Sequence, residues 1–216
     1  MSAILLEKLP NNLALYKIAM EEIPQTGQWL TANDKNFALF NYVDGHAQFI
    51  ASENECFPEK LILTGDILNI EDDESSLLMF ADSRAVPLLF FIINQLKTQW
   101  GIKRLRAKTS IILMGGDNSF PFIPIPSQIM IPGFSDEIIA SSQLLEDFSM
   151  PARLACLKSS PGCYDGTLDN MLDEINFHRL IDEDSTILCF GSNSLVQKAK
   201  KLFSASCNKQ FYVNFE

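Results

Sequence analysis

The chain has 216 residues, of which 47% are hydrophobic and 20% are charged, a balance typical of a folded globular protein. Its formal net charge of −10 excludes the broad basic face that releases counterions from phosphates, so we expect no nucleic-acid partner. The longest strongly apolar run, residues 85–93, is too short to span a membrane, and the first twenty residues do not resemble a signal peptide. We therefore expect no membrane association and a cytoplasmic location.

The first part of the chain, residues 1–70, is predicted to form a small β-domain. Short apolar segments alternate with turn-forming sequences such as Asn-Asn, Pro-Gln-Thr-Gly and Val-Asp-Gly, which favours a small antiparallel sheet or barrel. The acidic residues 71–76 mark the expected junction, and they are more typical of a solvated surface than of a metal site. We predict a reduced N-terminal antiparallel barrel over residues 1–72 and a second domain over residues 73–216.

The second part alternates apolar strands with amphipathic helices. This alternation predicts an α/β fold, a doubly wound unit with a five-stranded parallel sheet of the nucleotide-binding type, covered by helices on both faces. Ser135 is a plausible helix N-cap, and the basic residues of 103–108 are expected in a solvated connection. The predicted strands are 75–82, 110–116, 152–159, 185–192 and 209–216, and the predicted helices are 85–100, 135–148, 167–180 and 193–206.

A long connection, residues 114–133, follows one of these strands and contains four prolines. Ligands of open parallel sheets bind beyond the carboxyl ends of the strands, where this segment begins. Proline excludes helix and keeps a chain extended, so we predict a rigid wall beside that edge, with a merely stiff loop as the alternative. Phe120, Phe122 and Ile125 would give such a wall an apolar surface for a protein partner.

The cysteines and histidines do not predict a metal or disulfide framework. Five cysteines, an odd number without Cys-x-x-Cys spacing, favour reduced thiols. His46 and His178 lack the spacing of zinc ligands. Cys163 lies between glycines in an accessible loop, but nothing in the sequence places His178 beside it as a base.

Five segments match the motifs of one family in order and spacing. They are TGQWL (26–30), LTGDILNI (63–70), residues 77–97 with Pro87 opening a helix, GCYDGTLDNML (162–172) and ILCFGSNSLVQKAKKL (187–202). In these segments the chain resembles the ferredoxin-reductase-like superfamily, most of all the electron-transfer subunit of dihydroorotate dehydrogenase. The resemblance implies an N-terminal flavin-binding barrel and a C-terminal nicotinamide-nucleotide domain.

The resemblance also implies where the cofactors would lie. FAD or FMN would bind near Gly27, Gln28 and Trp29, and NAD(P) would approach Cys189 and Gly191, so that a hydride could pass between the two rings. Cys189 would face the nicotinamide as the candidate catalytic residue. The alternative for this cysteine is a place in the core, because free cysteine is among the most buried residue types.

Polar residues and glycines that follow the other strand ends are further candidates for nucleotide binding. Aspartates there could accept ribose hydroxyls, or could cap helices and form turns. Glycines could let a nucleotide approach the backbone, or could simply end a strand, and an arginine could contact phosphate as a charge. The candidates are Asp82, Arg84, Gly115, Gly116, Asp165 and Gly166, with Asp117 as one more strand-end carboxylate.

The chain also departs from the family in three respects. Residues 31–45 lack the arginine of the flavin signature, and the turn at residues 81–87 lacks the glycines that bind pyrophosphate. Cys207 alone cannot hold a [2Fe–2S] cluster, so we expect none. Two hypotheses follow: an oxidoreductase that transfers electrons between NAD(P) and flavin, or a divergent non-catalytic member that acts as a protein-interaction or nucleotide-sensing module. The sequence leaves open whether the chain forms a homo-oligomer.

Overall fold

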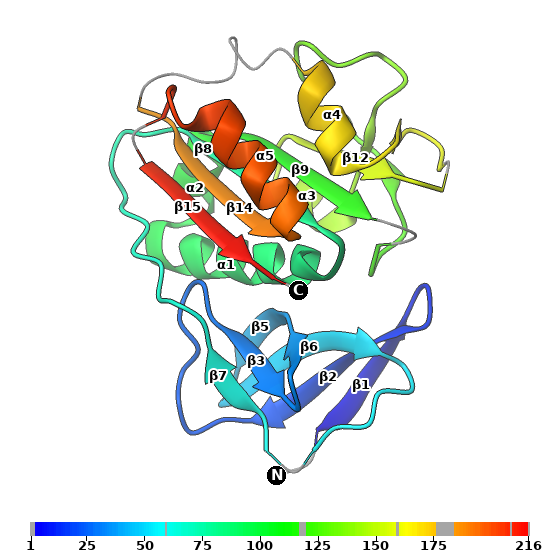
Figure 1. Cartoon of the computed structure of the whole chain (residues 1–216), viewed down its shortest axis with the longest axis vertical. Coiled ribbons are helices and arrows are strands. Elements are labelled where there is room, and N and C mark those ends of the chain that lie inside the picture. The colour runs from blue at the N-terminus through cyan, green and yellow to red at the C-terminus, as the bar shows by residue number, and fades with distance from the viewer. Residues whose placement is uncertain are drawn as a thin grey trace.

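The computed structural model describes residues 3–58, 60–116, 120–158, 160–175, 184–207 and 209–215. It has two parts, with the strands β1 to β7 in one and a parallel sheet flanked by helices in the other (Figure 1). The predicted boundary at residue 72 falls between β7 and β8 and itself stays a prediction. No helix among these described residues is long and apolar enough to cross a membrane.

The N-terminal part consists of two small antiparallel sheets, as the sequence predicts. Strands β4 and β5 are separated by Ala38 alone, so the chain passes directly from one sheet into the other. Positive φ angles at Asn33 and Asp34, and at Asp44 and Gly45, allow the tight two-residue turns that such hairpins need. One sheet has the order β1-β2-β6-β5 and comprises β1 (Ile4–Leu9), β2 (Leu13–Ala19), β6 (His46–Ser52) and β5 (Leu39–Val43). The other has the order β4-β3-β7 and comprises β4 (Lys35–Phe37), β3 (Trp29–Ala32) and β7 (Ile62–Thr64).

The C-terminal part is a parallel sheet of six strands rather than the predicted five. All five predicted strands are present, and the additional one is β13, a two-residue strand that carries no apolar pattern of its own. The order is β13-β12-β9-β8-β14-β15. The strands are β8 (Leu77–Asp82), β9 (Thr109–Gly116), β12 (Ala152–Cys156), β13 (Tyr164–Asp165), β14 (Thr186–Gly191) and β15 (Lys209–Asn214).

Helices cover both faces of this sheet, as a doubly wound unit requires. On β14, alternate residues face opposite sides: Leu188 joins the core beneath α1, and Ile187 joins a separate core beneath α4 and α5. Figure 1 shows α4 and α5 together in front of the sheet. The helices are a short 3-10 turn η1 (Ser83–Ala85), α1 (Val86–Trp100), α2 (Ile102–Lys108), α3 (Gln143–Asp147), α4 (Leu168–Glu174) and α5 (Asn193–Phe203).

Two predictions about local structure are wrong. The predicted helix at 135–148 is reduced to α3, which is capped by Ser142 and not by Ser135. In its first half, residues 135–138 form a turn, and β11 (Ala140–Ser141) is held extended because it pairs with β10 (Ile125–Pro126), a tertiary contact that overrides helical spacing. The basic residues expected in a loop form α2 instead, directly after Gly101. The predicted end of the helix at 167–180 lies partly outside the described residues.

The segment 114–133 is fixed to the body of the molecule at several points. The side-chain amide of Asn11, in the β1–β2 turn, donates to the carbonyl of Phe120 at 2.9 Å. The buried guanidinium of Arg153 donates to the carbonyl of Ile129 at 2.8 Å. Phe120 is only 2% exposed, so its predicted place on a partner surface is wrong, because it packs into the core. Residues 117–119 lie outside the described residues.

A single apolar core joins the two parts of the chain. Phe40 of β5 meets Phe90 of α1 with ring centroids 6.0 Å apart, and Phe90 meets Phe122 at 5.7 Å. Phe122 in turn stacks on Phe120 at 5.1 Å. On another part of the boundary, Trp29 of β3 packs edge-on against Phe215, with ring centroids 5.6 Å apart. Burying these rings ties the β-domain to the α/β-domain.

The acidic junction is paired with basic side chains rather than simply solvated. Asp72 accepts a hydrogen bond from Arg104 of α2 at 2.9 Å, and Glu71 pairs with Lys209 of β15 at 2.8 Å. Asp73 also pairs with Lys209. Hydrogen bonds from Lys209 and then from Ser75 hold the pKa of Asp73 below its ordinary value. Among the described residues, no acidic, histidine or cysteine cluster could hold a metal ion.

We expect the two parts to unfold together. The chain has one tryptophan in each part, Trp29 and Trp100, so the variants Trp29→Phe and Trp100→Phe each report on one part. Urea unfolding of both variants should give coincident fluorescence transitions. Phe90→Ala should lower the free energy of unfolding of both by about 3–5 kcal/mol, because it empties the shared core. Separate transitions, with only one shifted by Phe90→Ala, would contradict a shared core.

We expect the junction to lose its stabilising effect in acid. Asp73 has a pKa in the folded chain below its ordinary value of about 3.9, so its pairing stabilises the fold above about pH 4 and is lost as the pH falls. Asp73→Asn should therefore lower the melting temperature most near about pH 7 and clearly less near about pH 3, because the stabilisation declines once the pH falls below the ordinary pKa of the carboxyl. Glu22→Gln, at an exposed carboxylate, is the control and should change little at either pH. Equal destabilisation by Asp73→Asn at both pH values would rule out this electrostatic role.

Candidate functional site

The strand order places a crevice at the carboxyl ends of β8 and β14. From β8, the chain builds the sheet to one side through β9 and β12, and then returns to add β14 and β15 on the other side. Open parallel sheets bind ligands at such a point, because the connections leave the two strands in opposite directions. Asp82 ends β8, and Ser192 directly follows β14.

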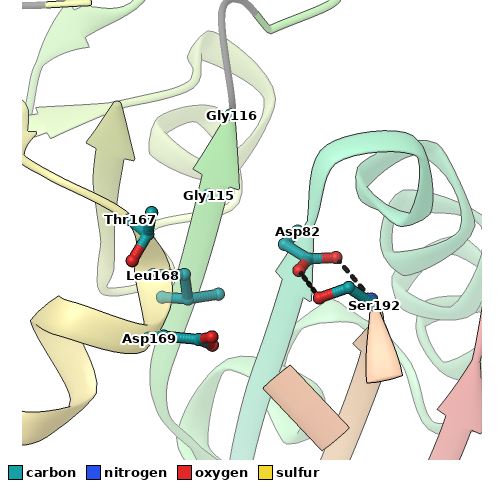
Figure 2. Close-up of a pocket in the computed structure, with 7 residues that line it drawn as sticks. All are labelled: Asp82, Gly115, Gly116, Thr167, Leu168, Asp169 and Ser192. Atoms are coloured by element: carbon teal, nitrogen blue, oxygen red, sulfur yellow. Dashed lines mark hydrogen bonds between the residues drawn. The ribbon is translucent and has the colours of Figure 1, made fainter. Parts of the chain in front are cut away.

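A small pocket of about 90 Å³ lies at this edge of the sheet. Figure 2 shows that its walls come from the ends of β8 and β9, the first turn of α4, and the start of α5. A pocket of this volume is far smaller than the several hundred Å³ typical of a cofactor site. The lining residues are Asp82, Gly115, Gly116, Thr167, Leu168, Asp169 and Ser192.

The carboxylate of Asp82 lies against the N-terminus of α5. It accepts one hydrogen bond from the backbone N–H of Ser192 at 2.9 Å and another from the Ser192 hydroxyl at 2.6 Å. Both bonds are drawn in Figure 2. The free N–H groups and the positive dipole at the start of a helix attract anions. Here the chain's own carboxylate is the anion that accepts these hydrogen bonds at the start of α5.

Gly191 makes this contact sterically possible. Its φ is +151°, and a Cβ atom added there would lie 1.9 Å from Oδ1 of Asp82. A side chain at this position would therefore displace the carboxylate. Gly115 has a comparable role, since an added Cβ would lie 2.8 Å from Cβ of Leu168 in α4. At these two glycines, which were predicted to contact a cofactor, the missing side chain makes space for Asp82 and for Leu168 of the same chain.

The charged side chains that line this pocket are both acidic. Asp169, in the first turn of α4, faces the pocket together with Asp82 and accepts a hydrogen bond from the Ser194 hydroxyl. Two carboxylates beside one small volume create a negative potential, which opposes an anionic ligand. Thr167, Asp169 and Ser192 were missed by the sequence analysis. The Thr-x-x-Asn cap of α4 and the Ser-x-x-Leu start of α5 are the local signals that could have indicated Thr167 and Ser192.

Cys189 is buried in the core and does not line the pocket. Its side chain is 0% exposed and packs beneath α5 with Phe80 and Leu195. Burial, followed by the nearby charges of Asp82 and Asp169, raises the pKa of this thiol. The described arrangement therefore matches the core interpretation of Cys189, and its predicted contact with nicotinamide does not fit because other side chains cover the sulfur.

The remaining nucleotide-binding candidates do not join the pocket. Arg84 is exposed in η1, and Asp165 is exposed on β13 at the sheet edge. Gly166 admits the ring of Tyr164, since an added Cβ would lie 2.8 Å from that ring. Asp117 lies outside the described residues.

The three candidate flavin residues contact other parts of their own chain. An added Cβ at Gly27 would lie 2.5 Å from the carbonyl oxygen of Asp66, and Gln28 accepts a hydrogen bond from the N–H of Gln25 at 2.9 Å. The indole N–H of Trp29 donates to the Asn36 side chain at 3.0 Å. This indole also packs against Phe215, at the boundary between the two parts.

The residues present do not fit the pyrophosphate of a dinucleotide at the β8–β14 crevice. The position at the α5 N-terminus is taken by a carboxylate, and the neighbouring charged side chain is a second carboxylate. For a flavin, the described candidates Gly27 to Trp29 supply a glycine turn and one aromatic ring at the domain boundary. They supply no positive charge for a flavin phosphate.

Comparison with known proteins shows the fold. No protein-family model matches the sequence, and no curated protein matches it either. A flavohem-like FAD/NAD-binding domain of nitric oxide dioxygenase from Vibrio cholerae is a structural match with 12% identity and a TM-score of 0.63, covering 98% of this chain and 97% of that one. The ferredoxin reductase of carbazole 1,9a-dioxygenase matches with 11% identity and a TM-score of 0.64, covering 99% of this chain and 67% of that one.

A third match extends over the whole of the present chain. Ferredoxin-NADP⁺ reductase from Plasmodium falciparum has 10% identity and a TM-score of 0.57, covering 100% of this chain and 94% of that one. At this level of identity the likeness concerns the fold, and it does not single out the dihydroorotate dehydrogenase subunit. The arrangement of a small antiparallel β-domain before a six-stranded parallel sheet is the two-domain fold of the ferredoxin-reductase-like proteins.

Proposed function

We propose that this chain is a divergent, non-redox member of the ferredoxin-reductase-like fold that acts as an interaction or ligand-sensing module. One observation carries the proposal: the Asp82 carboxylate accepts two hydrogen bonds from Ser192 at the crevice where a dinucleotide would place its pyrophosphate. A pyrophosphate placed there would have to break the hydrogen bonds between Asp82 and Ser192, and the displaced carboxylate would remain close to it. Like charges held that close, in a partly buried site, are strongly unfavourable.

The steric arrangement strengthens the electrostatic argument. Gly191 and Asp82 fit together so closely that the carboxylate has a defined place, and Gly115 lets α4 close the pocket from the other side. A cofactor site of this fold needs an open glycine turn after β8. In this chain the same turn holds a carboxylate and the start of α1.

A second candidate function is electron transfer between NAD(P) and a flavin, as in the dihydroorotate dehydrogenase subunit that the sequence resembles. The observation that favours it is the position of Trp29 and Phe215 at the domain boundary. The chain's structural neighbours include an FAD/NAD-binding domain, a flavohemoglobin with bound FAD and a ferredoxin-NADP⁺ reductase. In this candidate, Asp82 would leave Ser192, and the flavin ring would lie against Trp29.

The two candidates differ in their optical and binding properties. Purified protein is incubated with FAD or FMN, desalted, and scanned from about 300 to 600 nm, and NADH binding is measured by calorimetry. We expect no retained flavin bands and no NADH binding in the micromolar range. Flavin bands that survive desalting and bleach on addition of NADH would replace the non-redox proposal with the electron-transfer candidate.

Removing the charge of Asp82 should improve NADH binding. Asp82→Asn keeps the shape of the side chain, and its amide can still bond to Ser192. We expect about a tenfold or greater gain in affinity for NADH, because one like charge is lost from the crevice. Asp165→Asn removes an exposed carboxylate at the same end of the sheet and is the matched control, expected to change little. Equal gains in both variants would show a general charge effect and contradict the specific role of Asp82.

The close fit of Gly191 and Asp82 should appear as energetic coupling. Gly191→Ala should lower the free energy of unfolding by about 1–3 kcal/mol, because it forces a side chain into a strained backbone region and against the carboxylate. Asp82→Ala should make Gly191→Ala less harmful, by at least about 0.5 kcal/mol in a double-mutant cycle. Additive effects in urea unfolding would mean that the close approach has no energetic consequence.

A further inference from the structure

A second pocket lies between the β-domain and the α/β-domain and shares no lining residue with the pocket at the β8–β14 crevice. Its volume is about 260 Å³, nearly three times that of the pocket at Asp82. One side is formed by β1, β2, β5 and β6, and the other by α1, residues 121–122 and the start of α3. Ligand sites often lie at domain boundaries, and this volume matches a compound of one or two rings rather than a dinucleotide.

The walls of this interdomain pocket are apolar and preformed. Phe40, Phe90 and Phe122 contribute aromatic rings, and consecutive rings meet at steep angles of 80° and 67°. They therefore present both faces and edges toward the space between them. Phe90 is 2% exposed and Phe122 is backed by Phe120, so packing on their far sides holds the rings in place. Aliphatic side chains, among them Leu15 and Ile50, complete the walls.

The polar groups of the pocket differ in charge from those of an anion site. Glu7, on the exposed strand β1, is a lining residue, and the other polar lining residues, Ser142 and Gln143, are neutral. The described lining contains no lysine or arginine. With a net charge of −10 on the whole chain, a cationic ligand is attracted to this pocket and an anionic one is repelled.

We propose that the interdomain pocket binds a small aromatic amine. The planar group of the ligand packs among Phe40, Phe90 and Phe122, and its ammonium group lies at Glu7. Aromatic faces beside a cation add a further attraction. Because β1 and β5 belong to one domain and Phe90 and Phe122 to the other, a bound amine contacts both and stabilises their boundary. This site does not depend on the state of the β8–β14 crevice, so the NADH and flavin experiments leave it untouched.

Two probes that share one ring system and differ in charge test the proposal. Tryptamine and indole-3-propionate are titrated into the full chain at the same ionic strength, and binding is followed by NMR. We expect tryptamine to bind at least about tenfold more tightly, because its charge is opposite to that of the site. Intermolecular contacts should link its indole protons to the methyl groups of Leu9, Leu15 and Ile50. No tryptamine binding in the low millimolar range, equal affinity for both probes, or contacts mapped to another surface would each overturn the proposal.

Matched variants separate the local charge from the general one. Glu7→Gln should weaken tryptamine binding about twofold to fivefold, the scale of a solvent-exposed ion pair. Glu21→Gln removes the same charge at another surface pocket, between the end of β2 and β7, and should leave binding within error. Equal weakening by both variants would overturn the assignment to Glu7.

A variant that fills the pocket tests its apolar part. Leu15→Trp places a larger side chain into the space from β2 and should reduce tryptamine affinity by at least about tenfold. Unchanged affinity in a folded Leu15→Trp protein would overturn the proposal. If that variant does not fold, the NMR contacts in the unsubstituted protein test the proposal instead. Contacts from tryptamine to Leu9, Leu15 and Ile50 support it, and contacts to another surface overturn it.

Discussion

The apolar contact between the two parts of the chain is the interaction on which the rest of the structure depends. The ring of Phe40 on β5 packs against Phe90 on α1, and Phe90 also packs against Phe122 in the proline-rich segment. Without this contact, the small β-domain would have to be stable with only its own short sheets, which is difficult for so few residues. The same rings form the walls of the interdomain pocket, so the packing that holds the domains together also creates a binding surface.

A second constraint is electrostatic and concerns the carboxyl ends of β8 and β14. The start of α5 presents free N–H groups at the sheet's natural ligand position, and these groups need a negatively charged or polar partner. In this chain the Asp82 carboxylate is that partner, and Gly191, which has no side chain, allows the carboxylate to approach. A helix terminus that is satisfied internally has less to gain from a phosphate. The chain thus has the fold of the solved structures it matches, with its own carboxylate bonded to the helix start at the crevice.

The two pockets suggest a division of roles. At the β8–β14 crevice, the chain leaves only a small pocket of about 90 Å³, and the charged side chains that line it are acidic. At the domain boundary, a larger apolar space is left open, with one carboxylate among its lining residues. The proline-rich segment connects these regions: it begins at the crevice and then supplies Phe122 to the interdomain pocket. Its backbone is held at two points, by hydrogen bonds from Asn11 and from the buried Arg153.

The sequence by itself determined the alternation of strands and helices and the antiparallel β-domain. These features depend on local apolar patterns, which can be recognised in a single sequence. Only the tertiary structure decided that Asp82 meets Ser192, 110 residues away, and that Cys189 lies beneath α5. It also held residues 140–141 extended, through pairing with β10, where the local pattern favoured helix. Such outcomes depend on which distant segments pack together, and no local pattern specifies that choice.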